Sequence, residues 1–455
     1  MRISLLLQQR LFDDAFASGP RLLGPAPHPR YSLRPMDSEG QELQVPNHRQ
    51  LKSLELFAGG GGMALGFHNA GFHHTALVEW EHKACLTLLQ NARRWASVTD
   101  PSPPWLPEQV YEADVREYFG SDDFGKLPDV DLVAGGPPCQ PFSLGGVHAG
   151  MNDGRNMFPA ALDFVRELLP RFVVFENVPG LLRPSFLPYF EYVEEQLRWP
   201  TSPPVPGEPW QSHLNRLHAR RTGPKESRYW VTRQVINSAE LGVPQQRRRV
   251  FIIAVRRDVR DDPLPDTPVL PTHSEASLLY SQWVDHTYWA EHGIEPPPPN
   301  PERITEDLIR QLKIAEPTEP RWTTVRDAKA GTVDLAGISG ALPEPLDHQE
   351  SPGWLNHVGI PGARAYPGHT GSIIDYPAKT IKAGVHGVCG GEAMTRYEDD
   401  RLRYWTVRES ARIQSFPDDY EFVGARSNAM RHIGNAVAVK VAEAVGLRLH
   451  ELSGQ

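Results

Sequence analysis

The stretch LELFAGGGGMALGF, residues 54–67, joins a short apolar run to a turn of four glycines and then to a helix-like segment. A strand followed by a glycine turn and a helix lets backbone N–H groups approach a ligand closely. The turn lacks the G-x-G-x-x-G spacing and holds no Lys or Arg for phosphate charge. It therefore predicts a βα unit at a ligand site, but not a phosphate-binding loop.

Further apolar runs follow along the chain and alternate with helix-like stretches. The runs are TALVEW (75–80), DLVAGG (131–136), FVVFENV (172–178) and VFIIAV (250–255). They have the character of buried parallel strands. Helix-like stretches occupy 82–94, 157–169 and the C-terminal region, where Val437, Val441, Val445 and Leu449 form one apolar stripe. Strands alternating with helices predict an α/β fold with a parallel sheet.

The alternation stops after residue 257. From about 258 to 375 the chain is rich in Pro, Trp and His and shows no regular strand–helix rhythm. Its 455 residues suffice for roughly two or three domains. We therefore expect a second domain inserted in this region.

Charge is unevenly distributed. The formal net charge is -9, from 47 Lys and Arg against 56 Asp and Glu, which argues against a protein that coats nucleic acid by electrostatics alone. Residues 211–260 nevertheless hold twelve bases and three acids, whereas 261–320 hold twelve acids and three bases. The basic segment fits either a phosphate-facing stripe or a solvated surface with local ion pairs.

Cysteine and histidine usage narrows the class of protein further. Three cysteines, Cys85, Cys139 and Cys389, exclude a disulfide framework and fit a reducing compartment. The 18 histidines show no zinc spacing, so we expect no metal site. No segment resembles a secretory signal or approaches the roughly 18 apolar residues of a membrane span. We expect a soluble, cytoplasmic protein with no membrane partner.

Acids placed at strand ends indicate a nucleoside site beside the glycine turn. Glu79 could accept hydrogen bonds from ribose hydroxyls, and Trp80 could stack on an adenine. Asp114, followed by Val115, could hold the exocyclic amine and the face of the same base. A nucleoside with a neutral or positively charged tail fits better than a pyrophosphate. An ordinary βαβ turn with surface acids remains the alternative.

A second group of candidates surrounds a cysteine. GGPPCQPFS (135–143) places Cys139 at the carboxyl edge of the predicted sheet, in a loop that prolines make rigid. Glu176 stands at the end of the next strand, where burial can raise its pKa and let it donate a proton. Arg247 and Arg249 are two residues apart and can face the same side of a strand, suiting an oxygen-rich ring or a phosphate.

Taken in order, these motifs resemble those of the cytosine-C5 DNA methyltransferases of bacterial type. The resemblance rests on FAGGGG, VEW, GGPPCQPFS, ENV, QQRRR, RESARIQSFPDDY (408–420) and IGNAVAVKVAEAVG (433–446), and covers about 51–257 and 375–450. It implies a Rossmann-like S-adenosylmethionine-dependent domain with a smaller inserted target-recognition domain. The expected parts are an N-terminal extension (1–50), the first catalytic part (51–257), the target-recognition domain (258–380) and the closing motifs with a C-terminal helix (381–455).

The resemblance also implies residue roles. Cys139 would add to C6 of a flipped cytosine, Glu176 would bond or protonate N3, and Arg249 with Arg247 would hold O2 and the nearby backbone. Pro138 would help position the thiol. The residues expected to bind S-adenosylmethionine are Phe57, Gly59, Gly61, Glu79, Trp80, Asp114, Val115, Pro138, Asn435 and Val437.

The expected partner is double-stranded DNA, bound by a monomer. The enzyme would serve a restriction–modification system, another phage-defence system, or act as a solitary methylase. Two alternatives stay open on the sequence: a transfer-RNA cytosine-5 methyltransferase with the same motifs, and a non-catalytic DNA-binding relative. A nucleotide-linked oxidoreductase is disfavoured because nothing beside the glycine turn would hold a nicotinamide.

Overall fold

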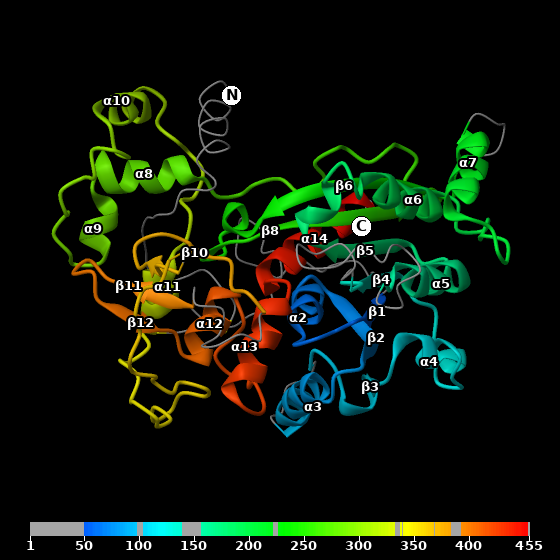
Figure 1. Cartoon of the computed structure of the whole chain (residues 1–455), viewed down its shortest axis with the longest axis horizontal. Helices are drawn as coiled ribbons and strands as arrows, with labels where there is room; N and C mark the ends of the chain where they lie inside the picture. The colour runs from blue at the N-terminus through cyan, green and yellow to red at the C-terminus, as the bar shows by residue number, and fades with distance from the viewer. Residues whose placement is uncertain are drawn as a thin grey trace, which may run out of the picture.

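A computed structural model describes residues 50–97, 103–138, 156–221, 226–332, 337–338, 340–367, 369–383 and 393–453. The predicted nucleophile Cys139, Cys389 and the N-terminal extension 1–49 lie outside the described residues. A twisted sheet with its helices occupies one side of the molecule, and helices α8, α9 and α10 form a separate group on the other side (Figure 1).

The central sheet has seven strands in the order β3-β2-β1-β4-β5-β8-β6. Their bounds are β1 (Leu51–Leu56), β2 (Phe72–Glu79), β3 (Val110–Glu112), β4 (Leu132–Gly135), β5 (Phe172–Asn177), β6 (Tyr229–Asn237) and β8 (Arg248–Arg256). Strands β1 to β5 pair in parallel, so their carboxyl ends meet at one edge of the sheet. The predicted α/β class is confirmed.

One strand runs against the prediction. VFIIAV was expected to be a parallel strand, but β8 is antiparallel to both β5 and β6, so that expectation was wrong. Only η5 (Ser238–Leu241) and β7 (Gln245–Gln246) separate β6 from β8. This connection is too short for the crossover of a dozen or more residues that a parallel pair needs.

Helices cover both faces of the sheet. The buried core of one face includes side chains from α4 (Val115–Phe119), α5 (Phe158–Leu168) and α6 (Leu187–Arg198). The core of the other face includes α2 (Gly62–Asn69) and α14 (Val439–Leu452), with α14 burying the predicted stripe of Val441, Val445 and Leu449. The remaining helices of this part are α3 (His82–Ser97), α7 (Trp210–Arg221), α12 (Val407–Ile413) and α13 (Arg426–Asn435), with short turns η1 (Pro107–Gln109), η2 (Phe124–Lys126) and η4 (Pro179–Leu182).

The break in the pattern after residue 257 corresponds to a change in architecture. Here follow α8 (Glu275–Trp283), α9 (Thr287–Glu291), α10 (Glu306–Ile314) and α11 (Val325–Ala330), then the short strands β9 (Ser372–Ile373), β10 (Ala378–Lys379), β11 (Met394–Arg396) and β12 (Leu402–Tyr404). Helices α8 to α10 pack into two small cores, one around Leu279 and one around Trp289 that also includes Ala239 of η5.

Buried residues from the later half of the insertion and its end instead share a core with Ala58 of the glycine turn and with α12 and α13: Val325, Ala328, Ile374, Ala378 and Ile381. Strand β10 also pairs with β7 beside the catalytic sheet. The later half of the inserted region is therefore packed into the catalytic part. The exact limits 258–380 of a target-recognition domain stay a prediction.

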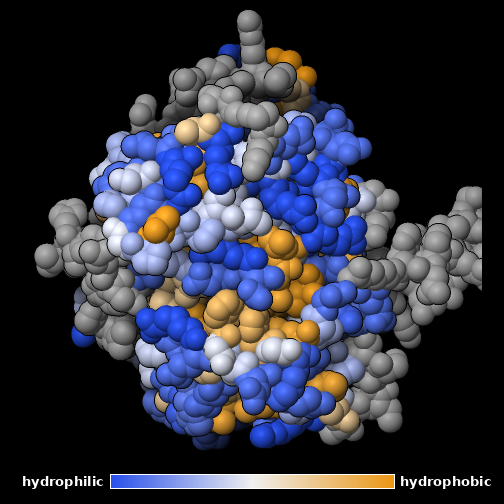
Figure 2. Space-filling view, turned by 90° about the vertical axis from the view of Figure 1, so that its right-hand side faces the viewer, coloured by the Kyte–Doolittle hydropathy of each residue, from blue (hydrophilic) through white to orange (hydrophobic). Residues whose placement is uncertain are grey.

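The side of the molecule that carries α4 to α7 is largely hydrophilic, and hydrophobic residues gather near the centre of this face (Figure 2). Among the described helices, none is long and apolar enough to cross a membrane.

Candidate active site

The glycine turn follows β1 at the carboxyl edge of the sheet. Gly59 and Gly61 have φ of 53° and 76°, a region that favours glycine. The Gly59 N–H donates to Glu79 Oε2 at 2.8 Å, and the Gly61 N–H donates to Ala58 O at 2.9 Å. A Cβ on Gly59 would meet only Phe57 O, at 3.9 Å, whereas one on Gly61 would lie 2.7 Å from the Tyr420 hydroxyl. Gly59 therefore faces open space, while Gly61 faces the protein interior.

Glu79 and Trp80 lie beside this turn, at the end of β2. The Glu79 side chain is 6% exposed, whereas Trp80 is 73% exposed. Burial raises the pKa of Glu79, opposed by backbone hydrogen bonds that include those from Glu81 and Gly59. A fixed carboxylate next to a free indole face fits a nucleoside, with the sugar on the acid and the base on the ring.

Asp114 and Val115 lie at the start of α4, after β3. The Asp114 carboxylate caps the helix by accepting the Arg116 N–H at 2.8 Å, and it also bonds the Arg116 guanidinium. The hydrogen bond from the Arg116 side chain lowers the pKa of Asp114. Val115 is buried. The Asp114 carboxylate, which the sequence predicts to contact the adenine, is thus ionised and already binds Arg116.

Glu176 and Arg249 meet at the end of β5. The Arg249 Nε lies 2.9 Å from Glu176 Oε1, in an ion pair between a buried carboxyl group and a partly buried guanidinium. Burial raises the pKa of Glu176, against the charges of Arg249 and Arg247. The structure therefore brings a carboxyl group and a guanidinium together at the end of β5.

The loop that leads to Cys139 begins next to this pair. A Cβ on Gly136 would lie 3.4 Å from Glu176 Oε2, so the two residues adjoin. Asn177 donates from Nδ2 to Pro137 O at 2.8 Å, and Met157 N donates to Pro138 O at 3.2 Å. Asn177 was not predicted as a site residue, although it belongs to the quoted ENV motif. It fixes the loop one residue before exposed Pro138.

Arg247 is placed differently from Arg249. It is 2% exposed, and its guanidinium donates to the carbonyls of Ile381 at 3.2 Å and Gly434 at 2.9 Å. Burial lowers the pKa of Arg247 to about 9. The contacts of Arg247 thus tie the end of the β6–β8 hairpin to the closing motifs.

The closing motifs are in direct contact with the glycine turn. Asn435 is exposed at the end of α13, whereas Val437 is buried. A Cβ on Gly62 would lie 2.2 Å from Val437 O, so the two backbones are in direct contact. His432 bonds Glu81 Oε2 through Nε2 at 2.5 Å. Sequence reasoning gave no role to His432 or Tyr420, although Tyr420 belongs to the quoted RESARIQSFPDDY motif.

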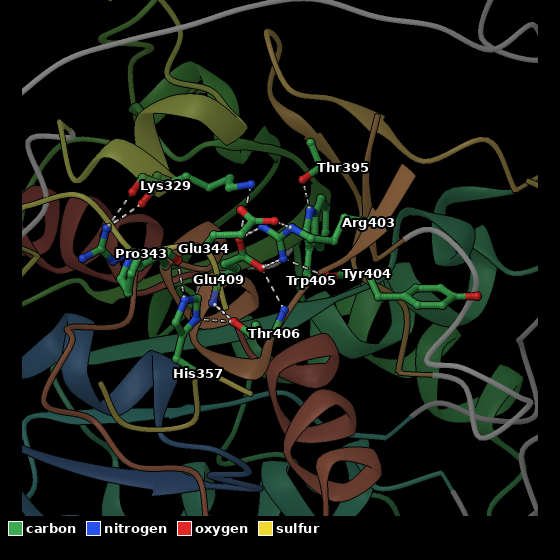
Figure 3. Close-up of polar contacts among 12 residues, drawn as sticks. Lys329, Pro343, Glu344, His357, Thr395, Arg403, Tyr404, Trp405, Thr406 and Glu409 are labelled. Carbon is green, nitrogen blue, oxygen red and sulfur yellow. Dashed lines mark hydrogen bonds and ion pairs between the residues drawn. The ribbon is translucent and has the colours of Figure 1, made fainter. Parts of the chain in front are cut away.

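A buried charged junction joins α11 to α12 (Figure 3). Glu409 lies 2.5 Å from an Arg403 nitrogen and 3.4 Å from Lys329 Nζ, and it accepts the Thr406 N–H that begins α12 at 2.8 Å. His357 bonds Thr406 through Nδ1 and the carbonyl of Pro343 through Nε2, both at 2.9 Å. The junction therefore links the inserted region to the first turn of a closing helix.

Among the described residues, five of the twelve bases in the basic segment 211–260 form ion pairs with acids. The pairs are Arg216 with Glu208, Arg233 with Glu194, Arg249 with Glu176, Arg256 with Asp258 and Arg257 with Glu226. Local ion pairs therefore occupy part of this segment, and a phosphate-facing stripe stays a prediction. Within the described part of the chain, no group of three or more His, Cys, Asp and Glu side chains could hold a metal ion.

The model of the C-5 cytosine-specific DNA methylases matches residues 51–198 and 224–451. The chain belongs to this family. Type II methyltransferase M.NgoMIV of Neisseria gonorrhoeae is 30% identical over 403 residues, which are 88% of this chain and 97% of that protein. M.NgoFVII from the same species is 29% identical over 390 residues, 85% of this chain and 83% of that protein.

A solved structure supports the fold. A candidate DNA modification methyltransferase encoded within an E. coli prophage has a TM-score of 0.52 and 20% identity, covering 89% of this chain and 100% of that one. This C-5 cytosine-specific DNA methylase therefore has the expected Rossmann-like methyltransferase fold and is a DNA cytosine-5 methyltransferase. The family uses S-adenosylmethionine, and Glu79 beside exposed Trp80 fits its adenosine group.

Proposed function

We propose that this methylase transfers a methyl group to C5 of a flipped cytosine, within a specific site of duplex DNA, through a covalent bond between Cys139 and C6. The observation that carries the proposal is the ion pair between buried Glu176 and partly buried Arg249, which lies beside the loop leading into Cys139. S-adenosylmethionine supplies an electrophilic methyl group when bound. The cytosine must leave the duplex to reach a site at the sheet edge.

The residues act on the cytosine ring in sequence. The Cys139 thiolate forms a bond to C6, and the electron pair displaced through the ring moves onto N3, where Glu176 stabilises it by donating a hydrogen bond or a proton. Arg249 orients Glu176 through their ion pair, and it would bond O2. C5, now an enamine carbon, takes the methyl group. Loss of the C5 proton then breaks the bond between sulfur and C6 and restores the thiolate.

Arg247 supports this site indirectly in the proposal. Its guanidinium bonds to Ile381 O and Gly434 O keep the closing motifs against the strand that carries Arg249. Arg247 is therefore a positioning residue, and its contact with the base stays a prediction.

The methyl-donor site is formed by the glycine turn and three strand ends. Glu79 would hold the ribose, Trp80 would stack on adenine, and Asp114 with Val115 would border the base. Gly59 leaves room for the donor, because a Cβ there would meet only one backbone atom. Phe57, Gly61, Pro138, Asn435 and Val437 complete the predicted set.

The proposed partner is double-stranded DNA, bound by one copy of the enzyme, with α8 to α10 and their neighbours reading the sequence. A restriction–modification role is supported by relatives named as type II methyltransferases. Bisulfite sequencing of DNA from cells that express the wild type, with Cys139→Ala as the control, tests the proposal. We expect one protected cytosine context in the wild type alone. Full conversion of every cytosine in both samples would contradict DNA methylation.

A further inference from the structure

Tyr420 makes a buried contact with the glycine turn that no predicted role explains. Its side chain is fully buried, and its hydroxyl donates to Gly60 O at 2.9 Å. The residue lies in the segment between α12 and α13, 360 positions along the chain from the glycine it contacts.

The contact continues through the turn as a chain of hydrogen bonds. The peptide unit between Gly60 and Gly61 accepts the Tyr420 hydroxyl at its carbonyl and donates from its N–H to Ala58 O. The peptide unit between Ala58 and Gly59 then donates from its N–H to Glu79 Oε2. Two peptide units are thus held at both polar ends, and the chain runs from the Tyr420 hydroxyl to the Glu79 carboxylate.

Tyr420 is itself held firmly. Its ring contacts Phe416 and Phe422, with ring centroids 5.0 and 5.2 Å apart from it. Arg408, also fully buried, donates to the carbonyls of Pro417 and Tyr420. Side chains packed to this density have one available position, so the hydroxyl is a fixed point against which the turn is set.

We propose that Tyr420 is a positioning residue of the methyl-donor site, which sets the glycine turn and through it the orientation of the Glu79 carboxylate. The inference rests on the proposed role of Glu79 toward S-adenosylmethionine. A carboxylate held in its binding orientation before the donor arrives saves the ordering that a mobile group would require. Loss of the hydroxyl should therefore weaken donor binding without removing any group that touches the donor.

Two matched Tyr→Phe variants test the proposal. Tyr420→Phe removes the hydroxyl bond to Gly60 O, and Tyr229→Phe removes an equally buried bond to Pro170 O, at 2.6 Å, on strand β6. Isothermal titration with S-adenosylmethionine and thermal unfolding are measured for both. We expect similar losses of Tm, but a donor Kd about three- to tenfold higher for Tyr420→Phe alone. Equal donor affinity in Tyr420→Phe and Tyr229→Phe would overturn the inference.

A double-mutant cycle with Glu79→Gln tests this inference separately from the proposed role of Glu79 in binding S-adenosylmethionine. If Tyr420 acts through Glu79, Tyr420→Phe should weaken binding less in Glu79→Gln than in the wild type. If Tyr420→Phe raises the donor Kd by the same factor in Glu79→Gln as in the wild type, the two residues act independently and the proposed hydrogen-bonded chain is contradicted. Unchanged donor binding by Glu79→Gln, or no binding by the wild type, would instead overturn the proposed donor site, and the inference with it.

Discussion

Glu176 is a carboxyl group whose ionisation is opposed by burial and favoured by the guanidinium of Arg249. A raised pKa favours proton donation by a carboxyl group that lies beside a reacting ring. Gly136 adjoins the same carboxyl group, which places Glu176 at the start of the loop that leads to Cys139, the proposed nucleophile.

Arg249→Met removes the charge but keeps much of the length of the side chain. We expect the single-turnover rate of methyl transfer to fall by about 10²-fold or more, because Glu176 loses the group that orients it. Arg256→Met is the matched control, since Arg256 lies at the other end of β8 and pairs with Asp258. Equal rates for the wild type and Arg249→Met would contradict the role given to the pair.

Sequence reasoning at this scale succeeded for Glu176, which lies near the end of β5 as predicted. Arg249 lies near the start of β8, and it meets Glu176 because β8 is antiparallel to β5, a direction that the sequence did not predict. Arg247 could not be placed in the same way. Its partners Ile381 and Gly434 are 134 and 187 residues away, and nothing in local spacing specifies them. Cys139 itself lies outside the described residues, so its role stays a prediction.

Among the elements, α2 and α14 approach each other so closely that one glycine is required. A Cβ on Gly66 would lie 2.3 Å from Val439 O and 2.5 Å from Ala442 Cβ. Because these atoms belong to a packed helix, they cannot move aside freely. The C-terminal helix α14 therefore packs directly against α2, the helix that follows the glycine turn.

Gly66→Ala should lower the free energy of unfolding by about 1–3 kcal/mol, through overpacking between α2 and α14. Gly125→Ala serves as the control, because a Cβ on Gly125 would meet nothing within 4 Å. That control should leave stability unchanged or raise it by about 0.4–1 kcal/mol. Urea unfolding of both variants is the measurement, and equal midpoints would show that the two helices are not in close contact.

The Glu409 junction predicts a pH dependence of stability. Burial opposes ionisation of Glu409, but the charges of Lys329 and Arg403 and the bonds from Arg403 and Thr406 outweigh it and hold its pKa at about 2. Its ordinary value is 4.5. A carboxyl group whose pKa is lowered by folding contributes its full stabilisation at pH values above its ordinary pKa. This contribution is lost as the pH falls from about 4.5 through about 2.

Glu409→Gln should therefore cost about 3 kcal/mol at neutral pH, because Arg403 and Lys329 lose a buried partner. It should also flatten the fall in stability below pH 4.5. The control is Glu451→Gln, whose exposed pair with Arg448 is worth less than about 1 kcal/mol. Chemical unfolding between neutral and acidic pH measures both effects. An unchanged acid slope in Glu409→Gln would contradict the ion-pair explanation.

The sequence correctly predicted where several strands and helices occur, but it did not predict the direction of β8. The runs that became β1, β2, β4 and β5, and the helices α3, α5 and α14, were all predicted. The orientation of β8 was missed because β6 was not recognised. The residues of β6 are mostly half-buried, so its sequence lacks the continuous apolar run that identified the other strands.

At the scale of the whole molecule, the local excess of basic residues is partly offset by ion pairs. In the described part of the chain, five of the twelve bases of 211–260 pair with acids from the same region or from the segments that precede it. The assignment to DNA instead follows from the family match over most of the chain.

The inserted region is only partly independent of the catalytic part. Helices α8 to α10 pack into two small cores, one of which includes Ala239 of the catalytic part, and α11 and β10 contribute to the core that contains α12 and α13. The sequence revealed the interruption through its lost periodicity. It could not reveal which half of the insertion packs back, because that depends on contacts between distant segments.

The central claim is that Cys139 attacks C6 of a cytosine held by Glu176 and Arg249. Duplex DNA containing 5-fluorocytosine at the methylated site tests it directly, because fluorine at C5 cannot leave as a proton and the covalent complex is trapped. With S-adenosylmethionine present, the wild type should give a complex that survives denaturing electrophoresis, and Cys139→Ala should give none. A trapped complex that persists in Cys139→Ala, or its absence in a wild type that methylates unmodified DNA, would contradict the account.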